Sequence, residues 1–198
     1  HYSSRRQRQM CIRDSHFLFV CLGVYPYLFL HMIENNFKKH LKQQSLKTKI
    51  LMVCLGNICR SPLAHGILEN MLDSNRFEVQ SSGTGAWHVG NKPDPRSIEV
   101  AAKNNIDISH QRAKQFSTYD FEIYDFIFVM DKSNFRDVIK LAKTPQEIEK
   151  VSLILDSTHR GQDKEVPDPY YGGEHGFKQV YEMLYKACEK IVSSGSFS

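Results

Sequence analysis

One segment of this chain limits its fold more than any other, because it joins a buried strand to a helix through a short loop. The strand pattern is Lys49–Cys54, a continuous apolar run of the kind that is buried on both faces of a parallel sheet. The loop Leu55–Ser61 follows, and Pro62 suits the first turn of a helix. Beyond it, apolar residues recur at helical spacing: Leu63, Ala64, Ile67, Leu68, Met71 and Leu72. The segment therefore predicts a strand–loop–helix unit.

Strand and helix patterns continue to alternate along the chain. Three further segments have strand character: Phe77–Gly83, Phe126–Met130 and Val151–Leu155. Helical patterns follow Asp94 and Asp131, each of which can cap a helix. A last helical stripe runs from Phe177 to Ile191. The alternation predicts an α/β fold with a four-stranded parallel sheet, helices on both faces and right-handed crossovers. Ligands of such sheets bind beyond the carboxyl ends of the strands, and the first strand ends on Cys54.

The loop after Cys54 has the residues of an anion-binding site. Gly56 lets the backbone turn tightly, and Asn57 tolerates a left-handed conformation. Backbone amides at a helix N-terminus converge on an anion, and the helix dipole favours negative charge there. The planar guanidinium of Arg60 can hold two phosphoryl oxygens at once. No Gly-Lys-Ser/Thr sequence follows, which excludes a Walker phosphate loop.

The same loop favours nucleophilic chemistry at Cys54. A positive field beside a thiol favours the thiolate, the reactive form of cysteine. Ser61 can donate a hydrogen bond to that sulfur and assist its later departure. The plainer interpretation makes Cys54 a buried strand end and Arg60 a surface charge, but the strand–loop–helix context favours phosphate binding.

The run Val53–Pro62, VCLGNICRSP, closely resembles the phosphate loop of the low-molecular-weight protein tyrosine phosphatases. The likeness covers about residues 48–192 in the family's order, through Ser82–Gly83, Trp87–Gly90, Pro93–Arg96, His110–Ala113, Met130–Asn134 and Val166–Gly172. The resemblance implies a three-layer sandwich, the phosphotyrosine protein phosphatase I-like fold. It also implies a protein-tyrosine phosphatase without metal or organic cofactor, acting on a phosphotyrosine-bearing protein. We expect a monomer or weak dimer.

The resemblance further implies a role for each residue of the loop. Cys54 would attack phosphorus and form a phosphocysteine, while Arg60 binds the phosphoryl oxygens. The loop backbone would bind the same oxygens, through Leu55, Gly56, Asn57, Ile58 and Cys59 with Ser61 beside them. Asp168 would protonate the leaving phenolate and then act as base when water hydrolyses the intermediate. Taken alone, Asp168-Pro169 reads as a turn, and only its pairing with the Cys54 loop makes it an acid.

The resemblance also implies roles for residues around the loop. The counterparts of Leu55, Ile58, Trp87, Tyr170 and Tyr171 line a slot that suits a flat phenyl ring. Those of Asn57, Ser61 and His110 form a hydrogen-bond network that holds the loop. Cys59 could form a disulfide with the nucleophile and protect it from further oxidation. For Cys188, packing in the core is the better interpretation.

Four other functions fit part of the pattern. An arsenate reductase shares the loop but needs two further cysteines on a mobile segment, and the domain offers only Cys188 beyond the loop. A protein-arginine phosphatase has Thr where Ile58 stands. A zinc or redox module would need Cys-x2-Cys spacing and a second ligand pair. A non-catalytic phosphate-binding module would have no use for Cys54, Arg60 and Asp168 together.

The charge of the chain is unevenly distributed. Residues 1–46 hold seven Lys and Arg against two acidic residues, whereas residues 47–198 hold 19 basic and 20 acidic residues. The charges of the domain, residues 47–198, nearly balance, so we expect no basic surface for binding nucleic acid. We interpret residues 1–46 as an N-terminal appendage, non-native or disordered, with Met32 as the candidate initiator. Its apolar run Phe17–Leu30 is too short to span a bilayer and contains Pro26, so a membrane partner is not expected.

The five cysteines of the chain indicate its compartment. They are odd in number and irregularly spaced, whereas a secreted disulfide framework is usually even and denser. We therefore expect a reducing, cytoplasmic setting. The nine histidines include no His-x-x-His or His-Glu-x-x-His spacing, so the sequence carries no metal signature.

Overall fold

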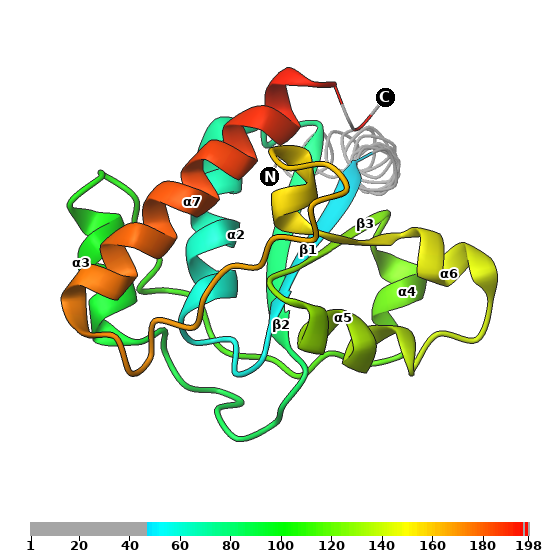
Figure 1. The fold of residues 1–198 in the computed structure, drawn as a ribbon, viewed down its shortest axis with the longest axis horizontal. Helices are drawn as coiled ribbons and strands as arrows, with labels where there is room; N and C mark the ends of the chain where they lie inside the picture. Colours follow the sequence, from blue (N-terminus) through cyan, green and yellow to red (C-terminus); the bar gives the residue numbers. More distant parts are fainter. Residues whose placement is uncertain (1–46, 196, 198) are drawn as a thin grey trace, which may run out of the picture. The chain divides into compact units, whose positions relative to one another are not determined.

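Four parallel strands form the centre of the computed structural model, which describes residues 47–195 and Phe197 (Figure 1). The strands are β1 (Thr48–Cys54), β2 (Phe77–Gly83), β3 (Phe126–Val129) and β4 (Val151–Leu153), hydrogen-bonded in the order β2-β1-β3-β4. All three pairings are parallel, which confirms the predicted α/β class. The appendage interpreted for residues 1–46 lies outside the described residues.

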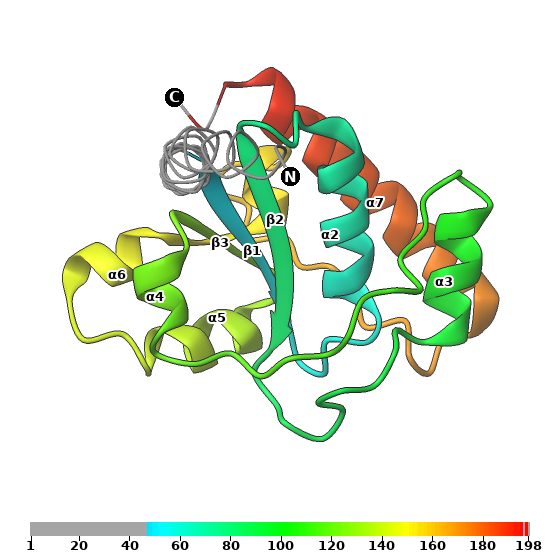
Figure 2. The same cartoon turned by 180° about the vertical axis from the view of Figure 1, so that it is seen from behind.

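Helices cover both faces of this sheet, as the alternating pattern predicts (Figures 1 and 2). The helices α2 (Arg60–Met71) and α7 (Gly173–Ser193) pack side by side on one face, and α3 (Pro95–Ala102) contacts both of them. The other face carries α4 (Asp120–Ile123), α5 (Lys132–Ile139) and α6 (Pro145–Glu149). The result is three layers, helix on sheet on helix.

Strand β1 belongs to two hydrophobic cores, because its side chains alternate between the two faces of the sheet. Ile50, Met52 and Cys54 join the core under α2 and α7, while Leu51 and Val53 join the core under α5. All five are at most 3% exposed. Burial on both faces explains why this strand is continuously apolar in sequence.

Two strand ends and two short helices differ from the expected elements: β3 ends at Val129, one residue before the expected end at Met130. Strand character was expected to continue to Leu155, but β4 ends at Leu153 and a 3-10 helix, η1 (Ile154–Ser157), follows. The short helices α4 and α6 were not expected, since four and five residues are too few to show an apolar stripe. Both caps, Asp94 before α3 and Asp131 before α5, are present and accept a backbone N–H of the following turn.

The carboxyl ends of β1 and β2 meet under the loop that follows β1. Cys54 pairs with Gly83 in register, and a Cβ atom at Gly83 would come within 2.7 Å of the Leu55 carbonyl oxygen. A side chain there would collide with backbone, so the close approach of the two segments requires glycine. The strand ends thus place the loop after Cys54 at the edge of the sheet where parallel α/β folds bind ligands.

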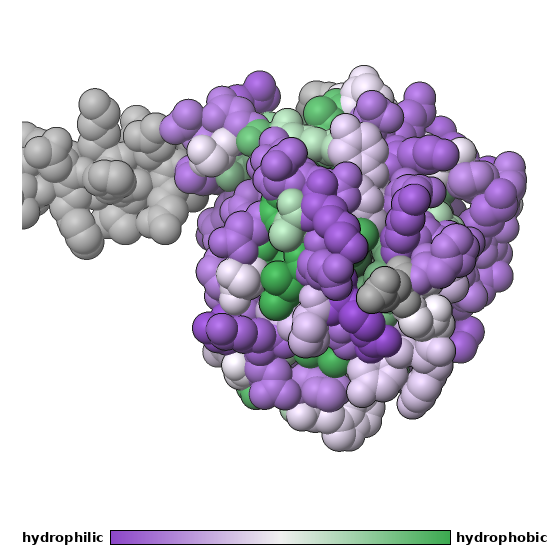
Figure 3. All heavy atoms as spheres, turned by 90° about the vertical axis from the view of Figure 1, so that its left-hand side faces the viewer, coloured by the Kyte–Doolittle hydropathy of each residue, from purple (hydrophilic) through white to green (hydrophobic). Residues whose placement is uncertain are grey.

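The face that carries α3 is largely hydrophilic, with hydrophobic side chains showing mainly in its hollows (Figure 3). Among the described residues, no helix is both long and apolar enough to cross a membrane.

Candidate active site

The loop between β1 and α2 wraps around the sulfur of Cys54. Asn57 has a φ of 54°, the left-handed conformation expected for it, and this turn brings its backbone N–H to 3.2 Å from Cys54 Sγ. The hydroxyl of Ser61 lies 3.0 Å from the same sulfur. Cys54 is 3% exposed, so these two groups provide much of the polar environment of its sulfur. Donors aimed at a sulfur stabilise its thiolate form.

The side chain of Asn57 holds the loop in this conformation. Its Nδ2 donates to Ser61 Oγ at 2.8 Å and to Ser81 Oγ at 2.9 Å, and its Oδ1 accepts the backbone N–H of Lys114 at 2.8 Å. Asn57 and Ser61 therefore belong to one network, as the resemblance implies. Ser81 and Lys114 were missed because nothing in their local sequence distinguishes them. Only the pairing of β1 with β2 brings Ser81 beneath the loop.

The third expected member of this network, His110, is not joined to Asn57 or Ser61 in the described residues. His110 is exposed, and within the described part of the chain its ring makes no hydrogen bond to the loop. The chain turns so that the next residue, Gln111, is buried instead and donates from Nε2 to the carbonyl oxygen of Pro62 at 3.3 Å. Ser81 and the Lys114 backbone support the loop where His110 was expected to do so.

Arg60 is a buried cation at the start of α2. It is 4% exposed, and its Nη1 donates to Asp131 Oδ2 at 2.6 Å and to the carbonyl oxygen of Val166 at 3.0 Å. Burial opposes its charged form, but the facing Cys54 sulfur and the Asp131 carboxylate outweigh burial and raise the pKa of Arg60. A guanidinium held in this way is a permanent positive charge beside Cys54.

Asp168 faces Arg60 from the segment that precedes α7. Its Oδ2 lies 3.7 Å from Arg60 Nη2, and its Oδ1 accepts the backbone N–H of Tyr170 at 3.1 Å. The side chain is 46% exposed, so it can exchange protons with solvent. The structure thus brings the three predicted catalytic residues, Cys54, Arg60 and Asp168, to one place.

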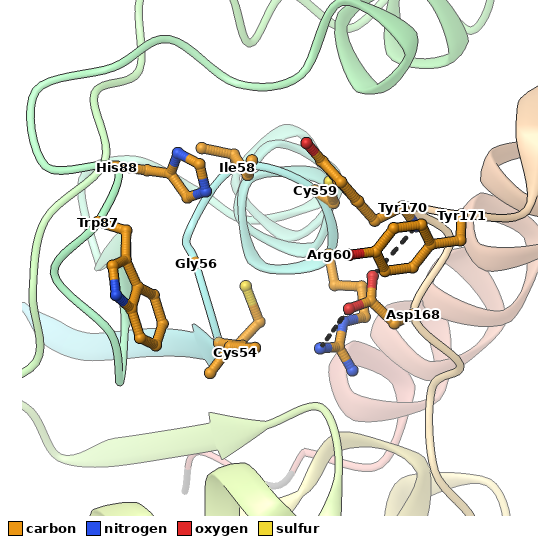
Figure 4. Close-up of a pocket in the computed structure, with 11 residues that line it drawn as sticks. Cys54, Gly56, Ile58, Cys59, Arg60, Trp87, His88, Asp168, Tyr170 and Tyr171 are labelled. Carbon is orange, nitrogen blue, oxygen red and sulfur yellow. Dashed lines mark hydrogen bonds and ion pairs between the residues drawn. The ribbon is translucent and has the colours of Figure 1, made fainter.

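These residues line an open pocket of about 300 Å³ (Figure 4). Trp87 and His88 stand on one side of it, and Asp168, Tyr170 and Tyr171 stand on the other (Figure 4). The full lining is Cys54, Leu55, Gly56, Ile58, Cys59, Arg60, Trp87, His88, Asp168, Tyr170 and Tyr171. Every residue expected to form the slot is in this set, and His88 is an addition to it. Trp87 is 74% exposed and Tyr171 is 93% exposed, which leaves their rings free to contact a ligand.

The other two cysteines in the described residues lie in different environments from Cys54. Burial, followed by the charge of the Asp94 carboxylate, raises the pKa of Cys59 to about 12. Burial raises the pKa of Cys188 to about 12, and this residue packs within the core on α7, as expected. Cys188 is 0% exposed, so it is not placed to relay a disulfide as an arsenate reductase requires. Among residues 47–195, no group of three or more His, Cys, Asp or Glu could hold a metal ion.

The arrangement provides three chemical functions in one pocket. The Cys54 sulfur lies within hydrogen-bonding distance of a backbone N–H and a hydroxyl, the Arg60 guanidinium is fixed beside it, and the partly exposed Asp168 carboxyl group faces that guanidinium. Such a site can bind a tetrahedral dianion, attack it, and protonate the group that leaves.

Comparison with known proteins gives a consistent result. Residues 49–195 match the family model described as low molecular weight phosphotyrosine protein phosphatase. The low molecular weight phosphotyrosine protein phosphatase of Schizosaccharomyces pombe is 43% identical over 151 residues, covering 74% of this chain and 96% of the relative. The protein of the same description from Sus scrofa is 32% identical over 153 residues, covering 75% and 96%.

Two solved structures show the same similarity. A protein tyrosine phosphatase from Entamoeba histolytica, with Hepes in its active site, superposes with a TM-score of 0.70 at 32% identity and covers 76% of this chain and 98% of its own. Vibrio vulnificus Wzb in complex with benzylphosphonate superposes with a TM-score of 0.68 at 30% identity, covering 75% and 99%.

Proposed function

Because this chain belongs to the low molecular weight phosphotyrosine protein phosphatase family, we propose that it hydrolyses phosphotyrosine in proteins, with Cys54 as nucleophile. One observation carries the proposal: Cys54 Sγ, the Arg60 guanidinium and the Asp168 carboxyl group line a single pocket. Small aryl phosphates are substrates of the same reaction.

In the first step, the phosphate group enters the loop and its oxygens take hydrogen bonds from the loop N–H groups and from Arg60. The Cys54 thiolate attacks phosphorus, so that an S–P bond forms while the P–O bond to the phenyl ring breaks. Asp168 gives its proton to the departing phenolate oxygen, because an unprotonated phenolate leaves poorly. The products are a phosphocysteine and a tyrosine side chain.

In the second step, water attacks the phosphocysteine. Asp168, now a carboxylate, takes one proton of that water, while the P–S bond breaks and inorganic phosphate is released. The electron pair of the broken bond returns to the sulfur of Cys54. Ser61 stabilises the departing thiolate, since its hydroxyl lies 3.0 Å from that sulfur. The sequence of steps regenerates the starting enzyme without a metal or an organic cofactor.

The walls of the pocket favour a phenyl ring over smaller phosphate esters. Trp87 and Tyr170 provide flat apolar surfaces on opposite sides of the loop (Figure 4). Ile58, at a position where the arginine phosphatases have Thr, adds an apolar contact and favours phosphotyrosine. The partner that the reaction requires is a phosphotyrosine-bearing protein.

The setting we propose is the cytoplasm, where the chain acts as a monomer or weak dimer. A catalytic thiol needs a reducing compartment, and the three cysteines of the described residues are free thiols. A phosphotyrosine-bearing protein, rather than nucleic acid or a membrane, is the partner we propose.

The first test is the hydrolysis of para-nitrophenyl phosphate by the freshly reduced full chain in EDTA, beside Cys54→Ser. We expect turnover by the wild type and background rates in the variant, because oxygen is a poor substitute for the thiolate nucleophile. Absence of activity in the reduced wild type, or full activity in Cys54→Ser, would overturn the proposal. Phosphotyrosyl peptides then test the substrate class directly.

A further inference from the structure

The start of α3 contacts the loop between β1 and α2 (residues 55–59), which we call the phosphate loop. The backbone N–H of Asp94 donates to the carbonyl oxygen of Ile58 at 2.8 Å, and Ser97 Oγ donates to the carbonyl oxygen of Cys59 at 3.3 Å. Both acceptors belong to the loop that surrounds Cys54. The two contacts fix the position of the first turn of α3 relative to the nucleophile.

Asp94 in turn fixes the guanidinium of Arg96. Asp94 Oδ1 accepts Arg96 Nε at 2.9 Å, and Asp94 Oδ2 accepts Nη2 at 2.8 Å, which is the two-point pairing of a carboxylate with a planar fork. The Asp94 side chain is 9% exposed and that of Arg96 is 32% exposed. The guanidinium also lies 4.4 Å from the ring centroid of Phe177 on α7, a cation–π contact. Its orientation is therefore set from two sides.

The remaining nitrogen of Arg96 reaches the segment that carries Asp168. Arg96 Nη1 donates to the carbonyl oxygen of Tyr170 at 3.1 Å. The backbone N–H of the same Tyr170 donates to Asp168 Oδ1 at 3.1 Å. A continuous path of hydrogen bonds thus runs from the phosphate loop through Asp94, Arg96 and Tyr170 to the carboxyl group of Asp168.

This path orients the two oxygens of Asp168. Oδ1 accepts the Tyr170 N–H, which leaves Oδ2, 3.7 Å from Arg60 Nη2, as the oxygen available to a leaving group. Val166 anchors the chain just before Asp168. Its carbonyl oxygen accepts a hydrogen bond from Arg60 Nη1, and its N–H donates to the carbonyl oxygen of Met130. Arg96 is the side chain that anchors it after Asp168.

From this geometry we propose that Arg96 is a positioning residue for the general acid, acting through Tyr170 to hold Asp168 Oδ2 toward the leaving oxygen. The inference rests on the proposed function. A general acid must come within about 2.6–3.2 Å of the atom it protonates. A displacement of about 1 Å costs up to about 100-fold in rate, so loss of this anchor affects the reactions that need the acid most.

The test compares leaving groups in the full chain. The parameter is kcat/KM, which reports phosphoryl transfer to Cys54 and not the later hydrolysis of the intermediate. We expect Arg96→Met to lower kcat/KM for phosphotyrosine about 10-fold or more, and to lower it much less for para-nitrophenyl phosphate, whose leaving group needs little protonation. Inhibition by inorganic phosphate should not change, because the phosphate loop keeps its own hydrogen bonds.

Three further variants separate a positioning role of Arg96 from general damage to the fold. Arg76→Met is the matched control, since Arg76 also stacks on a phenylalanine, Phe77, but at the opposite end of β2, and it should behave as wild type for both substrates. In an Asp168→Asn background, Arg96→Met should cause no further leaving-group-dependent loss, because there is no acid left to position. Arg96→Lys should recover only part of the rate, since an ammonium lacks the planar fork that serves Asp94 and Tyr170 together.

Equal slowing of the two substrates by Arg96→Met, or an undiminished selective loss in the Asp168→Asn background, would overturn the positioning role. A wild-type kcat/KM in Arg96→Lys would show that the simultaneous pairing of a guanidinium with Asp94 and Tyr170 is not required. Failure of the proposed function looks different, because the wild type would then show no Cys54-dependent turnover of either substrate, and the inference would fall with it.

Discussion

The hydroxyl of Ser61 lies 3.0 Å from the sulfur of Cys54 and accepts a hydrogen bond from Asn57 Nδ2. A hydroxyl has one proton to donate, and its acceptors here are the sulfur and the carbonyl oxygen of Ser82 at 3.3 Å. When Cys54 is a thiolate, charge assistance favours donation to the sulfur.

Removal of this hydroxyl should slow the step in which the thiolate departs. A hydrogen bond to a charged group is worth about 1.5–3 kcal/mol, so Ser61→Ala should reduce the rate of phosphocysteine hydrolysis about 10- to 100-fold. A rapid burst of para-nitrophenol followed by slow turnover would show accumulation of the intermediate. A fall in the burst rate with no change in the later rate would contradict this role.

Asp168→Asn should slow phosphotyrosine cleavage selectively. General acid catalysis contributes about 10²- to 10⁴-fold, and we expect a loss in this range in kcat/KM for phosphotyrosine. The loss for para-nitrophenyl phosphate should be much smaller, since its phenolate leaves without protonation. Equal losses for the two substrates would count against Asp168 as the acid.

Asn57→Ala should destabilise the fold as well as the loop. The change removes two buried donated hydrogen bonds and leaves the N–H of Lys114 without its acceptor, at an expected total of about 2–4 kcal/mol in the free energy of unfolding. Alanine is also strained at the positive φ of this position, whereas glycine is not. Asn57→Gly loses the same hydrogen bonds, so the difference between the two variants measures the backbone strain. Urea unfolding of both variants measures the difference, and a loss below 1 kcal/mol in Asn57→Ala would contradict this account of the network.

Carboxymethylation should distinguish the cysteines near neutral pH. The pKa values of Cys59 and Cys188 are raised to about 12, so both remain protonated thiols at pH 7, whereas Cys54 receives the N–H and hydroxyl donors that stabilise a thiolate. Peptide mapping after iodoacetate should find modification at Cys54 and little at the other two, with inorganic phosphate protecting Cys54. Modification of Cys59 as fast as Cys54 would refute this.

The Asp94–Arg96 pair should make stability depend on pH. Hydrogen bonding from Arg96 is the main reason why the pKa of Asp94 is lower in the folded chain than its ordinary value of about 4. A lowered carboxylate pKa stabilises the fold above the ordinary value, and this contribution is lost as the pH falls through the folded value. The wild type should therefore exceed Arg96→Met in free energy of unfolding at pH 7, with the gap closing below about pH 4. A gap that is constant from pH 7 to pH 3 would show that Asp94 does not depend on Arg96.

Much of the fold could be predicted because its two central strands, β1 and β3, are buried on both faces. Val53 and Cys54 lie in different cores, so both had to be apolar, and the run is visible in the sequence. The helices α4 and α6 could not be predicted in the same way, since they are too short to show a period. The end of β4 at Leu153 was also hidden, because Ile154 and Leu155 are buried equally well in a 3-10 turn.

The site could be predicted where its chemistry is local and not where it depends on distant contacts. Cys54, Arg60 and Ser61 lie on the two sides of one short loop, and their spacing indicates phosphate binding by itself. Asp168 was recognisable only through the resemblance. The contact of Arg96 with the acid segment had no local signal, because Asp94-Pro95-Arg96 is also an ordinary helix start. The side-chain direction of His110 was not visible either, because a motif position does not reveal which way the chain turns.

Arg60 and Val166, joined by a buried hydrogen bond, are 106 residues apart in the chain. A ribosome adds about 5–20 residues per second, so the nucleophile's loop would leave the ribosome roughly 5–20 seconds before the segment with the acid. Helix α7, which packs against α2, is made later still. Newly made protein would therefore begin to turn over substrate only when its synthesis is nearly complete, and a product truncated before Val166 would hold a cysteine loop with no acid.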